Sequence, residues 1–151
     1  MDYKNLTAPC GIACFECLVY KANKSEALRK GISEKLGIPY EQAVCEGCRN
    51  RSGVGYLSIK NNVFPEGRCI LMNEKGECKI YLCAENKHIH NCSECSDFPC
   101  DLLQPRADRA GVIPHNLKVY NLCLIRKMGL EKWAAEKAGQ VWNEYKTGKF
   151  E

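Results

Sequence analysis

Cysteines are the side chains whose spacing points most directly to chemistry, with twelve of them in 151 residues. Two cysteines separated by two residues form a tight turn that can aim both thiols at one metal ion. Gly47, inside one such turn, would ease it because glycine readily adopts a positive φ. Three C-x2-C pairs occur, called here the first, second and third pair: Cys14/Cys17, Cys45/Cys48 and Cys92/Cys95.

The expected compartment favours metal ligation over disulfides. The N-terminal sequence MDYKNLTAPCG has no basic segment followed by an apolar stretch, and no apolar run approaches the roughly 18 residues of a membrane span. We therefore expect a cytoplasmic protein without a membrane segment. Because cytosolic thiols are kept reduced, dense cysteine there indicates metal binding more often than a disulfide scaffold.

Zinc is the first candidate metal, because structural zinc sites are closed by four ligands and two C-x2-C pairs supply four thiolates. Of the remaining cysteines, Cys10, Cys69 and Cys100 could complete a third site or exchange into the other two. Cys123 lies in an apolar helical stretch, and we expect it to be a buried small hydrophobe. We expect two or more zinc ions, with these two sites as the simplest arrangement: Cys14, Cys17, Cys45 and Cys48; Cys78, Cys83, Cys92 and Cys95.

An iron–sulfur cluster is the alternative. Cys10 and the first pair form a C-x3-C-x2-C stretch, and with one later cysteine they could ligate a [4Fe–4S] cluster in a redox or electron-transfer protein. The same spacing superficially matches radical S-adenosylmethionine enzymes. Those enzymes need a large (β/α) barrel, for which this chain lacks the alternating strands and the length.

No catalytic motif accompanies the cysteines. The sequence contains no G-x-S-x-G, H-E-x-x-H, P-loop or G-x-G-x-x-G pattern, so a role other than an enzyme is favoured. His88 and His90 lie near the third pair, but surface roles are the simpler interpretation. An enzyme with an open zinc site or a zinc-activated thiolate stays a further alternative.

The charge pattern gives little support to nucleic-acid binding. The formal charge is +4, and two four-thiolate zinc sites would bring it to zero. Lys and Arg are dispersed along the chain without a run of five, which is typical of a solvated surface.

The elements that must position the cysteines are predicted to be mainly helical. Ser25 is a candidate N-cap, Leu28, Ile32 and Leu36 follow at helical spacing, and Gly37 can end the helix in the left-handed conformation. A second, short helix is predicted between Cys78 and the third pair.

Two further helices are predicted in the cysteine-poor C-terminal region. The first carries an apolar stripe at Leu117, Tyr120, Leu124 and Met128, with Gly129 as its end. We expect an αα-hairpin, with the tryptophans of the second helix in the core. The apolar face of that second helix consists of Leu130, Trp133, Ala134, Ala138, Val141, Trp142 and Tyr145.

Residues 51–78 differ from the rest, because Gly and Asn are frequent and Leu57 and Ile59 alternate with Ser58. We predict one or two short strands there. The expected fold class is therefore small α+β: metal-stabilised cysteine-rich loops with a short β-hairpin, and a helical C-terminal half. Residues 1–104 would form the metal-binding region and residues 105–151 a helical hairpin packed on it.

The sequence resembles a microbial family known as domain of unknown function 3795. The resemblance rests on "PCGIACFECLVY", "CEGCR", "CKIYLCAENKHIHNCSECSDFPCDLL" and "NLCLIRKMGLEKW", in this order, and the segment from Cys78 to Cys100 is its most specific part. It implies a zinc-binding protein without an established activity. It also implies ligand roles for Cys10, Cys14, Cys17, Cys45, Cys48, Cys78, Cys83, Cys92, Cys95 and Cys100.

The function most consistent with these features is a metal-structured protein-interaction module. Many cysteine pairs without a catalytic set suggest that metal holds the loops, while the exposed surface binds a protein partner.

Overall fold

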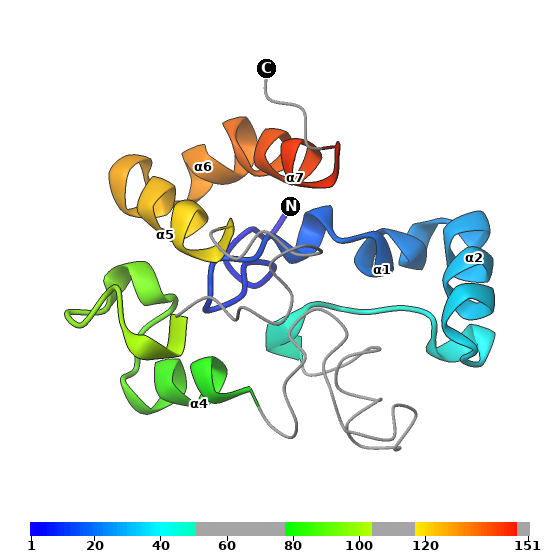
Figure 1. Ribbon diagram of the computed structural model, residues 1–151, viewed down its shortest axis with the longest axis horizontal. Helices are drawn as coiled ribbons and strands as arrows, with labels where there is room; N and C mark the ends of the chain where they lie inside the picture. The colour runs from blue at the N-terminus through cyan, green and yellow to red at the C-terminus, as the bar shows by residue number, and fades with distance from the viewer. Residues whose placement is uncertain (51–77, 104–116, 148–151) are drawn as a thin grey trace. The chain divides into compact units, whose positions relative to one another are not determined.

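The computed structural model describes residues 1–50, 78–103 and 117–147 (Figure 1). The chain divides into two compact units, Met1–Ala13 with Lys79–Glu151 (unit 1) and Cys14–Cys78 (unit 2). The described α-helices are α1 (Leu18–Lys21), α2 (Glu26–Leu36), α4 (Lys79–Asn86), α5 (Leu117–Met128), α6 (Leu130–Glu136) and α7 (Ala138–Thr147). The described 3₁₀ helices are η1 (Cys14–Glu16), η2 (Ala22–Lys24), η3 (Tyr40–Gln42), η4 (Cys48–Asn50), η5 (Cys92–Glu94) and η6 (Asp101–Leu103).

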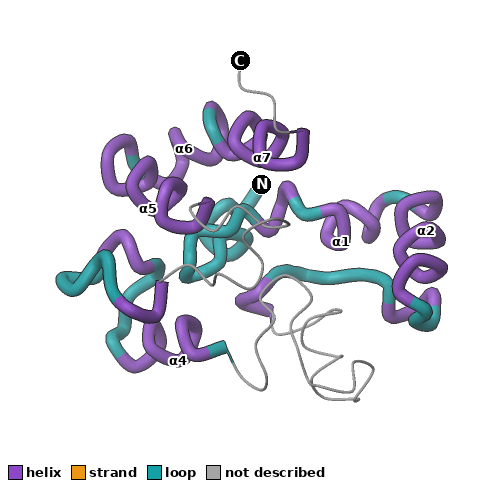
Figure 2. Tube along the Cα trace, viewed as in Figure 1, coloured by secondary structure: helices purple, strands orange, loops and turns teal. Residues whose placement is uncertain are grey.

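The predicted α+β class is wrong. The described part of the chain contains no β-strand, only an isolated antiparallel bridge between Thr7 and Ala13 (Figure 2). The expected β-hairpin rested on the alternation around Leu57 and Ile59, and that segment lies outside the described residues. Elsewhere the apolar residues recur at helical spacing, so the regular structure that buries them is helical.

Helix α2 forms as predicted in unit 2. Ser25 has an extended backbone, and its hydroxyl oxygen accepts a hydrogen bond from the Leu28 amide at 3.4 Å. Gly37 ends the helix in the left-handed conformation, at φ 64°. The following chain returns to α2, because the Arg29 guanidinium donates to the Tyr40 carbonyl at 2.8 Å and lies 4.4 Å from the Tyr40 ring centroid. Local sequence therefore determines both ends of this helix.

Removing the cap of α2 should have a measurable cost. We expect Ser25→Ala to lower the free energy of unfolding by about 1 kcal/mol, because the Leu28 amide loses its acceptor. Ser25→Asp is the matched control, since aspartate also caps and its charge favours a helix N-terminus. Urea unfolding of both variants checks this, and equal losses would contradict the capping role.

Residues 117–147 of unit 1 form three helices rather than the predicted two. Gly129 separates α5 from α6 at φ 84°, as expected, but Lys137 leaves helical geometry and separates α6 from α7. Helices α5, α6 and α7 contact one another, as Figure 1 shows. The predicted core face is confirmed at Trp133, Ala134, Ala138 and Val141, all of which are buried.

The apolar stripe predicted for α5 is wrong. Tyr120 is 52% exposed, whereas Asn121, Leu122 and Ile125 form the buried face. Asn121 explains the difference: its side-chain amide donates to the Gly11 carbonyl at 2.9 Å, and its oxygen accepts from the Trp133 indole at 3.3 Å. A search for apolar periodicity cannot find a face centred on a buried amide whose polar atoms are hydrogen-bonded.

Cys123 is also placed differently from the prediction. It is exposed on α5, next to the buried Leu122, so it is not the small core residue that its apolar neighbours suggested. The face of α5 that packs is set by Asn121, and Cys123 lies outside that face.

The predicted boundary between residues 104 and 105 lies outside the described residues. Helix α5 belongs to the same unit as the third pair and contacts it through η5.

No helix among the described residues is both long enough and apolar enough to cross a membrane.

Candidate metal centre

The first cysteine pair lies in unit 2 in a single 3₁₀ turn, η1. The Cys17 amide donates to the Cys14 carbonyl at 3.0 Å, which closes the turn, and both thiols are buried. Cys17 directly precedes α1, so the pair is held at the beginning of a helix.

The second pair has the turn expected from its glycine. Gly47 adopts φ 99°, and its amide donates to the Cys45 sulfur at 3.4 Å. The Asn50 amide then donates to the Gly47 carbonyl at 3.3 Å. An N–H directed at sulfur favours the thiolate form, which is the form that binds metal.

Hydrogen bonds hold the second pair against the helix that follows the first. The Cys45 amide donates to the Val19 carbonyl at 3.2 Å. The Asn23 side-chain amide donates to the carbonyls of Cys45, at 2.6 Å, and Tyr20, at 2.9 Å. Cys45 is half-buried and Cys48 is exposed. Unit 2 therefore contains both pairs of the first predicted site and ties them together through the backbone.

Unit 1 contains a small apolar cavity lined by four cysteines. Its volume is about 20 Å³, enough for one water-sized group. Helix α4 contributes one cysteine, η5 and the residue after it contribute two, and the segment before η6 contributes the fourth. These four, called here the cavity cysteines, are Cys83, Cys92, Cys95 and Cys100.

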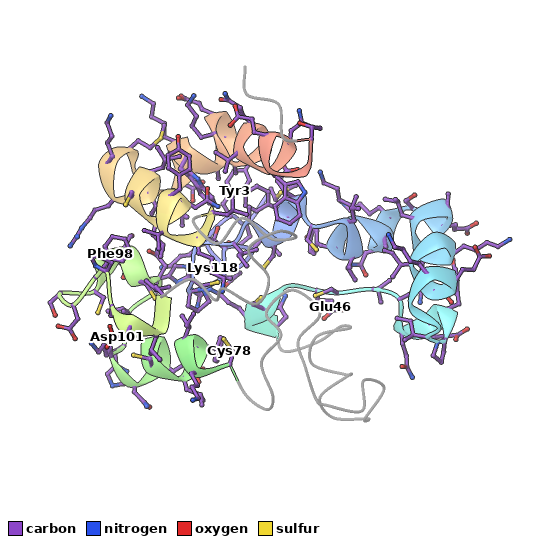
Figure 3. All side chains as sticks on the ribbon, viewed as in Figure 1. Tyr3, Glu46, Cys78, Phe98, Asp101 and Lys118 are labelled. Carbon is purple, nitrogen blue, oxygen red and sulfur yellow. The ribbon has the colours of Figure 1, made fainter. Side chains whose placement is uncertain are left out.

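Aromatic and aliphatic side chains complete the cavity wall. Ile80, Ala84 and Leu103 are buried, and Phe98 lines another side. Figure 3 labels Phe98; the Arg126 guanidinium of α5 lies 5.6 Å from the centroid of its ring. The cavity is thus closed by groups that offer no oxygen ligand, and its donor chemistry is that of sulfur.

The composition of the cavity differs from the second predicted site. Cys100 lines it and Cys78 does not, although Cys78 directly precedes α4. Cys83 lies on α4 and lines the cavity in unit 1, whereas Cys78 precedes the helix and belongs to unit 2. Cys69 lies outside the described residues.

Cys10 belongs to unit 1, while the first pair belongs to unit 2. The neighbouring Pro9 carbonyl accepts a hydrogen bond from the Cys92 amide at 2.9 Å, so the backbone of the Cys10 loop pairs with the third cysteine pair. Cys10 itself is buried but is not among the residues that line the cavity. The C-x3-C-x2-C stretch therefore crosses the division between the two units.

Neither histidine near the third pair lines the cavity. His88 is exposed, with φ 53°, directly after the turn that ends α4. The His90 ring nitrogen Nε2 lies 2.6 Å from the Lys4 carbonyl oxygen. His88 therefore lies at the surface, whereas His90 is half-buried beside Lys4.

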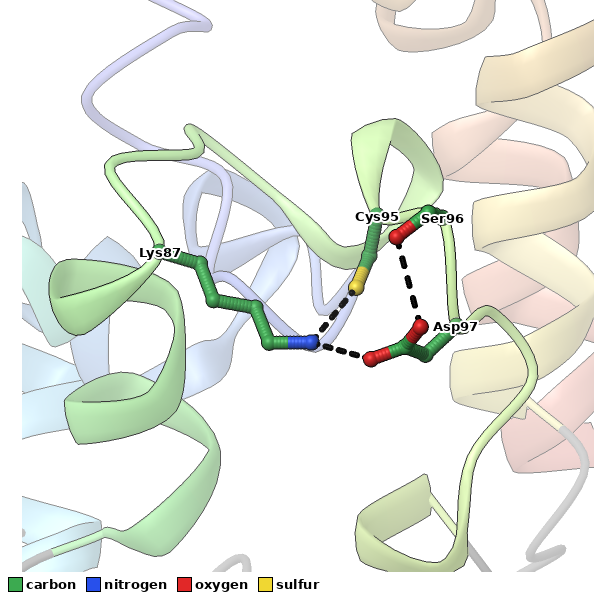
Figure 4. Close-up of polar contacts among 4 residues, drawn as sticks. All are labelled: Lys87, Cys95, Ser96 and Asp97. Atoms are coloured by element: carbon green, nitrogen blue, oxygen red, sulfur yellow. Dashed lines mark hydrogen bonds and ion pairs between the residues drawn. The ribbon is translucent and has the colours of Figure 1, made fainter.

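Lys87 is a residue that the sequence analysis did not single out. It lines the cavity, and its ammonium group donates to the Cys95 sulfur at 3.4 Å and to the Asp97 carboxylate at 2.5 Å (Figure 4). These hydrogen bonds, first with Asp97 and then with Cys95, raise the pKa of Lys87, and Lys87 lowers the pKa of Asp97. Lys87 directly follows α4, and its backbone amide donates to the Cys83 carbonyl at 3.0 Å, so its spacing of four residues from Cys83 was the available signal.

The cysteines are grouped but do not form a finished ligand shell. Across residues 1–50, 78–103 and 117–147, no set of three or more His, Cys, Asp or Glu side chains is arranged to hold a metal ion.

Comparison with known families decides where the chain belongs. A family described as protein of unknown function (DUF3795) matches residues 6–105. The chain belongs to this family. The match includes all ten cysteines predicted as ligands and confirms the resemblance seen in the sequence. No curated protein and no solved structure matches the chain.

Proposed function

We propose that this DUF3795 protein is a zinc-structured protein-interaction module. The observation that carries the proposal is the apolar cavity lined by Cys83, Cys92, Cys95 and Cys100. Four sulfur donors with no competing oxygen ligand suit zinc, which forms closed tetrahedral sites with four thiolates. Zinc would join α4, η5 and the segment before η6, and so would stabilise the packing of these three segments.

The iron–sulfur alternative rests on other residues. Cys10 and the first pair supply its C-x3-C-x2-C stretch, and none of these three cysteines lines the cavity. Because Cys10 and the first pair belong to different units, the iron–sulfur redox protein is the second choice.

A second zinc site is proposed in unit 2, from the first and second pairs. Its support is the Gly47 amide directed at the Cys45 sulfur and the hydrogen bond from Cys45 to Val19. Two sites would account for eight of the ten predicted ligands. Cys10 and Cys78 would then be ligands of neither site.

Closed sites of this kind leave no open coordination position for a substrate, which supports a structural role for the metal. The function would then reside in the surface that the metal organises, and a protein is the proposed partner. Lys and Arg are dispersed along the sequence without a run of five, which gives little support to nucleic acid as the partner.

Metal analysis is the decisive experiment. We expect the protein, purified without oxygen, to contain about two zinc ions per chain and to be colourless, because each site takes four cysteines. Elemental analysis and a visible absorption spectrum measure this. Iron, labile sulfide and a broad visible band would replace the zinc proposal with the iron–sulfur alternative.

The interaction role needs a separate test. Once a protein partner has been isolated on the zinc-loaded chain, binding should be lost after chelation and restored by added zinc. Binding that survives complete removal of the metal would contradict a metal-structured interaction surface.

A further inference from the structure

The four-cysteine cavity has one charged group in its wall, Lys87. Its ammonium nitrogen lies 3.4 Å from the Cys95 sulfur, within the range of an N–H···S hydrogen bond. Cys95 is buried, while Lys87 is 38% exposed, so the lysine reaches the sulfur from the solvent side. One of the buried cavity cysteines is thereby capped by a cation.

Asp97 fixes the position of that cation. Its carboxylate lies 2.5 Å from the Lys87 nitrogen and also accepts a hydrogen bond from the Ser96 hydroxyl at 3.3 Å (Figure 4). Because Asp97 is 64% exposed, water screens its charge. Lys87 is 38% exposed, so water screens its charge as well, and what distinguishes the ammonium is its hydrogen bond to the Cys95 sulfur.

Lys87 also connects the two parts of the ligand set. Its backbone amide donates to the Cys83 carbonyl at 3.0 Å at the end of α4, while its side chain reaches the turn that contains Cys95 and Asp97. The residue thus links the segment that supplies one proposed ligand to the segment that supplies two others. Its loss would remove both a charge and a geometric constraint.

We propose that Lys87 is a positioning residue for the zinc site of unit 1, holding the Cys95 thiolate by a charge-assisted hydrogen bond. This inference rests on the proposed function. Zinc with four thiolates carries a net charge of −2, which is unfavourable in an apolar cavity. The ammonium group offsets part of that charge, and Asp97 keeps it in place.

The test measures zinc affinity in the full chain. Lys87→Met removes the charge and the hydrogen-bond donor but keeps a long side chain. The dissociation constant of one of the two bound zinc ions should rise about 10- to 100-fold, as measured by competition with a chromophoric chelator. The other ion serves as an internal reference. Lys87→Arg should restore most of the affinity, because it keeps a cationic donor.

Lys79→Met is the matched control. Lys79 is exposed at the other end of α4, does not line the cavity, and loses the same charge on substitution. Substituting cobalt for zinc adds a spectroscopic readout, because the sulfur-to-cobalt charge-transfer band should shift in Lys87→Met and stay unchanged in Lys79→Met. Asp97→Asn tests the anchor with less risk to folding, and it should weaken binding in the same direction.

The outcomes separate this inference from the proposed function. If the wild type binds zinc and Lys87→Met and Asp97→Asn bind it equally tightly, with an unchanged cobalt spectrum, the role of Lys87 is wrong and the zinc proposal stands. If the wild type binds no zinc, the proposed function fails and the role of Lys87 fails with it.

Discussion

Replacing Cys92 or Cys95 by serine is expected to lower the thermal stability of the protein far more than replacing Cys123. Both residues of the third pair are buried and line the four-cysteine cavity, whereas Cys123 is exposed on α5. A structural zinc ion contributes on the order of 10 kcal/mol of apparent binding free energy, so a site that loses one of its thiolates forfeits much of that stabilisation. An exposed cysteine changed to serine shifts stability by about 0.5 kcal/mol or less.

Thermal unfolding of the three variants, with zinc content measured on the same samples, checks this prediction. Each variant of the third pair should lose one zinc ion and unfold at a much lower temperature, and the Cys123 variant should match the wild type in both respects. Chelation should lower the unfolding temperature of the wild type at least as far as the Cys92 and Cys95 substitutions do, because it would remove the ion that these variants lose together with the second one. Equal effects at Cys92, Cys95 and Cys123 would contradict the ligand assignment.

Gly11→Ala should have the second largest effect, for a reason unrelated to metal. Gly11 has φ 85°, a conformation that residues with a side chain rarely adopt. A Cβ atom there would lie 2.8 Å from Leu122 Cγ and 2.9 Å from the Lys118 carbonyl oxygen. Backbone strain and overpacking together should lower the free energy of unfolding by about 3 kcal/mol.

Gly31→Ala is the matched control for this substitution. Gly31 lies inside α2 and is exposed, and a Cβ atom added there would have no neighbouring atom within 4 Å. The same chemical change should therefore raise stability by about 0.5–1 kcal/mol, because alanine has the higher helix propensity. Urea unfolding midpoints compare the two variants. A Gly11→Ala protein as stable as the wild type would mean that the Gly11 loop does not pack on α5 as described.

The Gly11 position also shows why part of the fold could not be predicted from sequence. Nothing local distinguishes Gly11 from the other glycines, because its constraint comes from Leu122 and Lys118, more than a hundred residues later. Asn121 is a second example. Its side-chain amide donates a hydrogen bond to the Gly11 carbonyl and thereby determines which face of α5 is buried. Contacts between distant segments decided both features, and local periodicity contains no information about them.

The features that follow from the sequence alone are local ones. Ser25 and Gly37 set the ends of α2, Gly47 allowed the turn of the second pair, Gly129 ended α5, and the cysteine spacing marked the candidate ligands. These features depend on backbone propensity and on hydrogen bonds within a few residues, so neighbouring residues suffice to specify them.

The grouping of the cysteines, in contrast, depends on contacts between segments that are distant in the sequence. The tertiary structure assigned Cys10 to one unit and the first pair to the other, brought Cys100 rather than Cys78 to the cavity, and added Lys87 beside Cys95. Spacing along the chain limits which thiols can share a turn, but it does not determine which turns meet. Which cysteine-bearing turns contact one another depends on the packing of α4, η5 and the segment before η6. Burial of apolar side chains brings such segments together regardless of their separation in sequence.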